Sequence, residues 1–352
     1  MSEKYIIFGA ELSPYSVKVR SYFRYKNIPH TWIIRDQTTQ KEYNKYAKIQ
    51  IVPLVITPEK KGLQDSTPII QLMEKQHPDN TIAPKEIHTA FVSRLLEEYA
   101  DEWMVKCMFH YRWRYPEDQA SAASRFAELF TPTWINRIPI ANRVFKKYAA
   151  ATFRKRQKSR LWVVGSNENT ESLIEKSFTD FLQLFETHLQ TRHYCFGFRP
   201  SIGDFGLWGQ IYNAWTDPTA NKIIESGYPK TLEWIHRMLD PRAGGEFELW
   251  EDLKETLMPI LKDQLGAVFL PWLAANNQAI TNNNDHLSVK IKGENFSHSV
   301  GSAQKYHLKS FTMLLKEYQA IPERHMLNSI LEEAGCVDYF QYPWIWLDEP
   351  DV

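Results

Sequence analysis

The N-terminal part of the chain alternates short apolar runs with amphipathic segments. The apolar run at 5–8 ends at Gly9 and predicts a buried strand. Between Pro14 and Tyr25 the apolar positions recur at helical spacing, which predicts a helix. The same patterns predict strands at 30–34, 53–57 and 63–64, a polar helical segment up to Tyr46, and a helix from Ser66 to about Gln76. The order βαβαββα predicts a four-stranded sheet with helices on both faces.

The remainder of the chain is predicted to be mostly helical. Residues 77–84 hold two prolines and indicate a linker. After them the pattern predicts helices at 87–113, 119–129, 138–157, 170–190, 201–215 and 229–239. Beyond a turn at 241–245 it predicts helix to about 280, a strand at 287–292, and helices near 304–318 and 323–334. We therefore expect an α/β thioredoxin-like domain at 1–84, an all-helical domain at 85–245 and a mostly helical C-terminal extension at 246–352.

The composition is that of an ordinary globular protein. Of 352 residues, 43% are hydrophobic and 24% are charged, which is ample material for a core. The formal net charge is zero, which argues against attraction of the whole molecule to nucleic acid or to an anionic membrane. No apolar stretch approaches the roughly 20 residues that span a bilayer, and the N-terminal run is too short for a signal peptide. Three cysteines without paired spacing favour free thiols, so we expect a cytoplasmic protein.

The first predicted helix opens with Ser13-Pro14. Serine is a favoured N-cap and proline suits the first helical turn, so this helix should begin beside Ser13 with unpaired backbone N–H groups. The positive end of the helix dipole favours an anion there and lowers the pKa of a thiol, which is ~8.5 when free. The Ser13 hydroxyl can donate a further hydrogen bond to a thiolate. In isolation this motif is more often an ordinary helix cap.

Two more motifs follow at the start of a strand and of a helix. Val52-Pro53 opens the third predicted strand, where proline is unusual because it cannot donate to the sheet ladder. A cis bond there would turn the Val52 backbone toward a cleft, where a bound peptide could pair with it like an added strand. Asp65-Ser66 opens the next helix, and together an N-cap hydroxyl and an acid suit an α-amino acid head group. A trans-proline edge strand and a plain N-cap are the alternatives.

In this order and spacing the three motifs resemble the cytosolic glutathione S-transferase family. The resemblance covers roughly residues 4–240 and extends to the capping box Ser201-x-x-Asp204 of that family's helical domain. It implies that Ser13 activates the glutathione sulfur, that the Val52 backbone binds the cysteinyl unit, and that an acid–serine pair holds the γ-glutamyl end. The glutathione-contacting residues that it implies are Ser13, Tyr15, Val52, Pro53, Asp65 and Ser66.

The sequence also departs from that family's pattern. Asp65 is shorter than the more usual glutamate, and Ile51 stands where many members carry a polar residue, so Lys45 or Lys48 is the alternative contact for the glycyl end. A serine rather than a cysteine at position 13 argues against the redox-active branches, which need a thiol there. Ser16 is a weaker alternative hydroxyl.

The long predicted helix carries an aromatic stripe. Tyr99, Trp103, Cys107 and Tyr111 recur every four residues. In glutathione transferases this helix borders the pocket for the electrophile, so the resemblance implies an apolar or aromatic second substrate beside Tyr99, Trp103 and Tyr111. A helix-bundle core or a dimer interface would carry the same stripe. No further ligand pair accompanies Cys107 and His110, so we expect a packed thiol, a surface imidazole and no metal.

A basic run stands apart from these motifs. Between Arg137 and Arg160 there are nine Lys/Arg and no acid. Such a run is usually a solvated helix face, and otherwise it attracts anionic substrates or lipid head groups. The phosphate-cradle and nucleophile-elbow motifs are absent from the sequence.

The resemblance implies a glutathione S-transferase with a role in detoxification, glutathione as co-substrate, and a homodimer. Conjugation, dehalogenation and ether cleavage are the same displacement by a thiolate, so the reaction stays open among them. The alternative is a non-catalytic module of the same fold that binds or scaffolds. The intact motifs favour the enzyme, whereas the large C-terminal extension leaves the module open.

Overall fold

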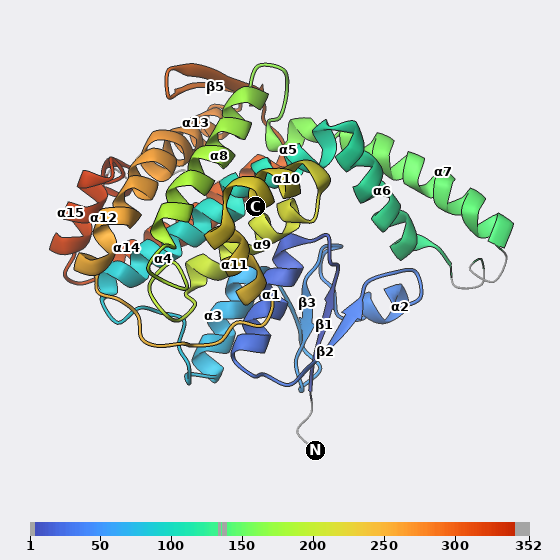
Figure 1. Cartoon of the computed structure of the whole chain (residues 1–352), viewed down its shortest axis with the longest axis horizontal. Coiled ribbons are helices and arrows are strands. Elements are labelled where there is room, and N and C mark those ends of the chain that lie inside the picture. The colour runs from blue at the N-terminus through green and yellow to red at the C-terminus, as the bar shows by residue number, and fades with distance from the viewer. Residues whose placement is uncertain (1–3, 133–134, 136–138, 342–352) are drawn as a thin grey trace.

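The computed structural model describes residues 4–132, 135 and 139–341 of the chain. Its N-terminal part is built on a four-stranded mixed sheet in the order β2-β1-β3-β4 (Figure 1). β1 is parallel to β2, and β3 is antiparallel to both β1 and β4. The strands are β1 (Tyr5–Gly9), β2 (His30–Ile34), β3 (Leu54–Ile56) and β4 (Gly62–Gln64). All four predicted strands are therefore confirmed, with small changes in their ends.

Three helices flank this sheet. α1 and α3 cover one face and α2 lies on the other (Figure 1). α1 begins as predicted, with Ser13 as N-cap and Pro14 in its first turn, and it buries Val17, Tyr22 and Phe23. The helices are α1 (Pro14–Tyr25), α2 (Gln40–Tyr43) and α3 (Ser66–Gln76). The thioredoxin-like N-terminal fold predicted from the element order is confirmed.

A long interrupted helix follows the linker. α4 (Ile87–Tyr99), the π-helical segment η1 (Ala100–Met104) and α5 (Val105–Arg114) run on without a break, so the single predicted helix acquires a π-helical segment near its middle. The next helices are α6 (Pro116–Phe130), α7 (Pro139–Lys158), α8 (Glu171–His188), α9 (Ile202–Trp215), α10 (Pro218–Gly227) and α11 (Pro229–Arg237), with the 3₁₀ turn η3 (Leu161–Val164) between α7 and α8. α10 was not predicted. The predicted capping box of α9 is confirmed, because Ser201 Oγ accepts from Asp204 N at 3.3 Å and Asp204 Oδ2 from Ser201 N at 2.9 Å.

The C-terminal extension is mostly helical, as predicted. Its elements are α12 (Trp250–Ile260), the π-helical segment η4 (Leu261–Phe269), α13 (Leu270–Thr281), β5 (His286–Ile291), β6 (Glu294–Ser299), α14 (Ser302–Gln319), α15 (His325–Glu333) and α16 (Asp338–Gln341). The single predicted strand is one arm of a β5–β6 hairpin whose turn residues, Lys292 and Gly293, have positive φ. β6 escaped prediction because Phe296 is its one apolar residue.

The extension packs directly on the long helix. Tyr99 contacts Phe269 with ring centroids 5.9 Å apart, and Trp103 contacts Trp272 at 5.8 Å. One hydrophobic core therefore includes residues from Ile7 to Phe340. None of the described helices combines the length and the apolar character needed to cross a membrane.

Candidate functional site

The sheet register brings the three sequence motifs to one edge. Phe8 of β1 pairs with Leu54 of β3, and Leu54 pairs with Gln64 of β4. The loop that follows β1, the residues that precede β3 and the turn that follows β4 therefore leave the sheet at the same end. The Val52–Pro53 peptide bond is cis, as the resemblance implies. Residues separated by about fifty positions in the sequence thus share one surface.

Ser13 marks the beginning of α1 at this edge. Its side chain is half-buried, and its Oγ accepts a hydrogen bond from Ser16 N at 3.3 Å. The first turn of α1 contains no acidic residue, so the positive end of the helix dipole is not neutralised locally. Ser16, the alternative hydroxyl, is fully buried. Ser13 is therefore the hydroxyl that can meet a ligand.

Asp65 and Ser66 mark the beginning of α3 at the same edge, but Asp65 is the N-cap, and Ser66, which was predicted to be the N-cap, is the buried first residue of the helix. Asp65 adopts a left-handed φ of 79° and makes no capping hydrogen bond to α3. Its Oδ2 instead accepts a hydrogen bond from the Tyr306 hydroxyl of α14 at 2.6 Å. Nothing near Asp65 in the sequence indicates Tyr306, because 241 positions separate the two residues. The C-terminal extension thus contacts the acid that was predicted to bind an ammonium group.

Two phenols near this acid are held in their neutral form. The Tyr15 hydroxyl donates to the backbone oxygen of Asp101 in η1 at 3.0 Å. Burial, and then the negative charge of Asp101, raise the pKa of Tyr15 well above its usual value. Burial and the charge of Asp65 likewise raise the pKa of Tyr306. Both phenols are therefore hydrogen-bond donors at physiological pH and not anions.

A buried network of charges supports the helix starts from behind. Lys18 Nζ of α1 donates to Asp101 Oδ2 at 2.6 Å and to Thr67 Oγ1 of α3 at 3.3 Å, and it also pairs with Glu97 of α4. Burial would raise the pKa of Glu97, but Arg94 and Lys18 outweigh it and hold that pKa below its usual value. The network fastens α1, α3 and the long helix to one another, which fixes the positions of the two helix N-termini.

Two further carboxyls of the network have raised pKa values. Burial, partly offset by Arg94, raises the pKa of Glu98 to about 7. Burial, partly offset by Lys18, raises the pKa of Asp101 to about 6. Glu98 Oε2 accepts a hydrogen bond from Ser310 Oγ of α14 at 2.9 Å, so the extension contacts this carboxyl as well.

The loop before the cis-proline is held by a residue that the motifs did not include. Gln64 Oε1 accepts from Lys48 N at 2.8 Å and from Ile49 N at 3.1 Å, and Gln64 Nε2 donates to Ile51 O at 3.1 Å. Gln64 therefore fixes the chain that leads into Val52. The sequence signal was a glutamine at the end of an edge strand, next to Asp65. Val52 is half-buried and Pro53 is buried.

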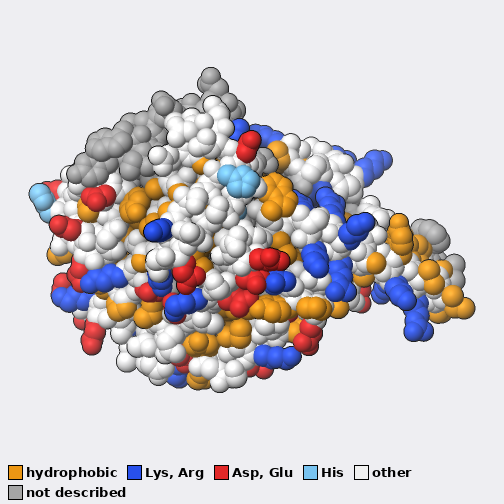
Figure 2. Space-filling model, turned by 90° about the horizontal axis from the view of Figure 1, so that it is seen from above, with side chains coloured by type: hydrophobic (Ala, Val, Ile, Leu, Met, Phe, Trp, Pro, Cys, Tyr) orange, Lys and Arg blue, Asp and Glu red, His pale blue; other side chains and the backbone are white. Residues whose placement is uncertain are grey.

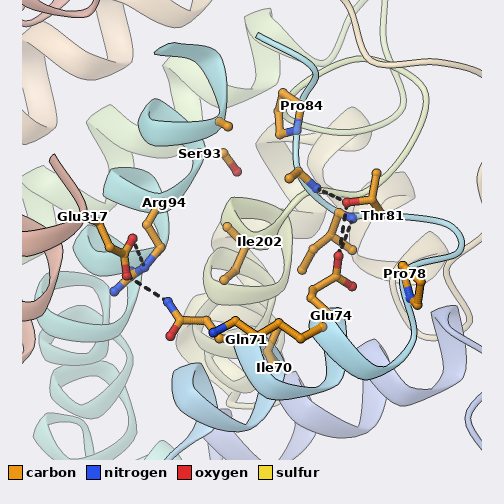
Figure 3. A pocket seen from close by; sticks show the side chains of 14 residues that line it. Ile70, Gln71, Glu74, Pro78, Thr81, Pro84, Ser93, Arg94, Ile202 and Glu317 are labelled. Atoms are coloured by element: carbon orange, nitrogen blue, oxygen red, sulfur yellow. Dashed lines mark hydrogen bonds and ion pairs between the residues drawn. The ribbon is translucent and has the colours of Figure 1, made fainter. Parts of the chain in front are cut away.

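Two clefts border α3. One, of about 510 Å³, is lined by Gln64, Asp65, Lys48 and Lys309, so two cations share this cleft with the acid. The other, of about 610 Å³, lies on the far side between α3, α4 and the linker (Figure 3). Its polar groups pair with one another, since Gln71 Nε2 donates to Glu317 Oε1 at 2.8 Å and Glu74 accepts from Thr81 and Ile82 at 3.2 Å. None of the predicted site residues lines this second cleft.

The structure corrects the expected pocket for the second substrate. Tyr99 and Trp103 are fully buried, and Tyr111 is 2% exposed. The Tyr99 hydroxyl donates to Gln264 Oε1 at 2.9 Å, and Trp103 Nε1 to Ser177 Oγ at 2.8 Å. The cause is the extension, whose η4 and α13 cover the face of the long helix that carries Tyr99 and Trp103. The stripe is helix-bundle core, which was the alternative left open.

The two expectations for Cys107 and His110 have different outcomes. Cys107 is fully buried, as expected, and burial raises the pKa of its thiol to about 12. The expected surface imidazole is wrong, because His110 is fully buried, with Nδ1 2.8 Å from Ser166 Oγ and Nε2 2.9 Å from Glu175 Oε1. No cluster of three or more potential metal ligands occurs among the described residues.

The fold and the site together define a thioredoxin-like domain joined to a large helical region. The N-terminus of α1 in this domain has no acidic residue that would repel an anion. Residues 7–81 match the family model of the glutathione S-transferase N-terminal domain. This part of the chain is therefore similar to the N-terminal domain of glutathione S-transferases, and the resemblance recognised from the three motifs is confirmed. Among curated proteins no relative matches the sequence.

Solved structures with a similar arrangement are distant in sequence. A glutathione S-transferase from Methylobacterium radiotolerans in complex with glutathione sulfonate is 17% identical, with 67% of this chain and 90% of that chain covered and a TM-score of 0.40. A Tau class enzyme from mango is 15% identical, with coverage of 72% and 97% and a TM-score of 0.41. The glutathione transferase GSTFuA3 from Phanerochaete chrysosporium is 13% identical, with coverage of 68% and 98% and a TM-score of 0.48.

Proposed function

We propose that the protein is a glutathione transferase that attacks an apolar or aromatic electrophile with the glutathione thiolate. The observation that carries this proposal is the common sheet edge shared by Ser13, the cis Val52–Pro53 bond and Asp65–Ser66. One edge thus offers a helix dipole with a hydroxyl, an extended backbone segment and an acid beside a second helix start. A tripeptide with a thiol, two peptide groups and an α-amino acid end is complementary to that set.

Each residue has a defined task in this proposal. The Val52 backbone pairs with the cysteinyl unit, and Pro53 holds that backbone in place. Asp65 pairs with the γ-glutamyl ammonium, while Ser66 and the N–H groups of α3 bind its carboxylate. Tyr15, whose hydroxyl donates to the backbone oxygen of Asp101, borders the same surface with its ring. Lys48 and Lys309, which line the same cleft as Asp65, add positive charge for the carboxylates.

The chemical step requires only stabilisation of an anion. The thiol loses its proton to solvent, and the Ser13 hydroxyl and the α1 dipole stabilise the sulfur anion that remains. The sulfur then forms a bond to the electrophilic carbon, and the leaving group departs with the bonding electrons of the broken bond. Ser13 donates a hydrogen bond throughout and forms no covalent bond. Conjugation, dehalogenation and ether cleavage differ only in the leaving group.

Retention on immobilised glutathione, followed by turnover with an aryl halide and with aryl ethers, tests the proposal. We expect both retention and glutathione-dependent loss of the aryl substrate. Retention without turnover would favour the alternative, a non-catalytic module, for which the contacts of α14 with Asp65 and Glu98 provide a specific argument. Failure of retention would exclude the enzyme and would leave only a scaffolding module that does not bind glutathione.

The biological role, the cellular location and the oligomeric state belong to the same proposal. A detoxifying enzyme in the cytoplasm fits the three free cysteines, Cys107, Cys195 and Cys336, all of which are buried. The homodimer implied by the resemblance remains a prediction. Light scattering of the eluting protein would show twice the chain mass of 41.4 kDa if the homodimer forms.

A further inference from the structure

The α6–α7 hairpin projects from the body of the molecule. In Figure 1 it extends to the side, with α7 outermost. Its inner contacts are aromatic, since the Phe153 ring lies 5.6 Å from that of Phe126 and 5.0 Å from that of Phe130. No residue of α7 is fully buried. The helix therefore has one packed face and one face that no part of the described chain covers.

The outer face of α7 carries an apolar stripe. Ile140, Val144 and Tyr148 follow one another at intervals of four residues, so they lie along the same side of the helix. Their side chains are 80%, 63% and 73% exposed. These three are among the most exposed large hydrophobic side chains of the described residues, and all belong to this one helix. A single exposed hydrophobic residue needs no explanation, but an aligned set on a projecting helix does.

The same helix is strongly basic. From 139 to 160 the chain has eight Lys/Arg and no acid, and Arg137, the ninth of the run, lies outside the described residues. Of these eight, only Lys146 has a carboxylate partner among the described residues, Glu128 at 3.8 Å. Figure 2 shows blue and orange side chains gathered on this projection. Because the whole chain has zero formal net charge, the positive charge here is local.

We propose that the outer face of α7 docks on an anionic membrane surface. A helix with an apolar stripe flanked by Lys and Arg lies in the plane of a bilayer interface, with the stripe toward the acyl chains and the cations at the phosphates. At 100° per residue Lys147 falls about 20° to one side of Ile140 and Lys155 falls between Val144 and Tyr148, so both cations lie on the exposed side of the helix that carries the stripe. Nucleic acid would engage the cations but would leave Ile140 and Val144 in water, so the observations favour lipid.

Flotation of the full chain with vesicles tests this proposal. We expect the protein to float with vesicles of equal parts phosphatidylcholine and phosphatidylserine and not with phosphatidylcholine alone. Each cation near such a surface contributes about fivefold, so Lys147→Glu/Lys155→Glu should weaken binding at least about tenfold. Ile140→Ser/Val144→Ser should leave only a weak interaction that added salt abolishes, because the apolar contribution is lost.

A matched control separates local from general charge effects. Lys75→Glu/Lys290→Glu makes the same change in net charge at two exposed positions outside α7 and should bind vesicles like the unmodified chain. Retention on glutathione should be equal in all variants, which checks that each is folded. The proposal would be overturned if the unmodified chain did not float with the anionic vesicles, or if the α7 variants floated as well as the unmodified chain. Tight binding to single-stranded RNA without vesicle binding would overturn it in favour of nucleic acid.

Discussion

Ser13 and Ser16 lie one turn apart on α1 and have opposite surroundings. Ser13 caps the helix at the sheet edge, whereas Ser16 is fully buried behind it. Ser13→Ala removes the hydroxyl donor to the thiolate but keeps the helix dipole. We expect kcat/KM with an aryl halide to fall about 10- to 100-fold while the glutathione Kd changes little. Thiolate absorbance of bound glutathione against pH should show a higher thiol pKa.

Ser16→Ala is the control for that experiment. It makes the same chemical change three residues away, at a side chain that no ligand can reach. Turnover and thiol pKa should stay as in the unmodified protein. If Ser16→Ala lowers turnover and Ser13→Ala does not, the assignment of Ser13 as the activating hydroxyl is wrong.

Asp65 should determine glutathione affinity more than turnover. Asp65→Asn removes the charge that pairs with the γ-glutamyl ammonium, while the amide oxygen can still accept from Tyr306. A hydrogen bond to a charged group contributes about 1.5 to 3 kcal/mol, so the Kd measured by calorimetry should rise about 10- to 100-fold. Tyr306→Phe keeps the carboxylate and should have the smaller effect. An unchanged Kd for Asp65→Asn would place the amino end of glutathione elsewhere.

Glu98 makes stability depend on pH. Its pKa in the folded protein is about 7, above the usual 4.5, so the folded state binds the proton more tightly than the unfolded state. The ionised carboxyl therefore destabilises the fold above pH 7, and stability increases as the pH falls from 7 toward 4.5. Glu98→Gln removes this penalty. We expect it to stabilise the protein by about 1 to 3 kcal/mol at pH 8 and to have no such effect near pH 4.5.

Urea unfolding at both pH values would measure that difference. Glu317→Gln is a suitable control, because Glu317 also contacts Arg94, at 3.4 Å, but is partly exposed. It should not gain stability at pH 8. A Glu98→Gln variant that is less stable than the unmodified chain at pH 8 would show that the ion pair with Arg94 outweighs burial.

At the scale of elements, the helix α9 sets how closely α1 can approach. A Cβ on Gly209 of α9 would lie 2.7 Å from the carbonyl oxygen of Pro14, which is backbone and cannot move aside alone. Gly209→Ala should therefore push the first turn of α1 outward. We expect a loss of about 1 to 3 kcal/mol in stability and a lower turnover, because Ser13 moves with that turn. Thermal unfolding and aryl halide turnover measure the two effects.

Gly227 of α10 provides the control for the Gly209→Ala substitution. A Cβ there would meet no atom within 4 Å. Gly227→Ala should leave turnover unchanged and affect stability by less than about 1 kcal/mol, since alanine favours helix. Equal losses in the two variants would mean that close approach at Gly209 has no special role.

The elements that were predictable are those whose signal is local. Apolar runs and helix caps predicted the ends of β1, α1 and α3 to within about a residue. Ser201 and Asp204 predicted the start of α9. β6 was missed because its polar residues give no strand pattern. The π-helical segments η1 and η4 were missed because they leave the apolar spacing of the helix nearly intact. Short local patterns indicate which elements exist, and they do not report how two distant elements meet.

At the scale of the whole molecule, the unpredictable part of the site came from the far end of the chain. Ser13, Val52 and Asp65 were found because each belongs to a local motif. Tyr306 and Ser310, which contact Asp65 and Glu98, have no motif, and their role depends on where α14 packs. The aromatic stripe was assigned to a pocket for the same reason, since only tertiary packing shows that η4 and α13 cover it.

The extension should accordingly unfold together with the rest of the chain. Trp272 of α13 is fully buried and contacts Trp103 of η1, and the Lys106 ammonium of α5 lies 3.8 Å from its ring centroid. Trp272→Ala should lower the free energy of unfolding by about 3 to 5 kcal/mol. The whole molecule should still unfold in a single calorimetric transition, at a lower temperature. Trp162→Ala, at a tryptophan that is 48% exposed, should cost far less. Two transitions, of which only one moves in Trp272→Ala, would show instead that the extension is an independent domain and that its contacts with Asp65 and Glu98 are incidental to the fold.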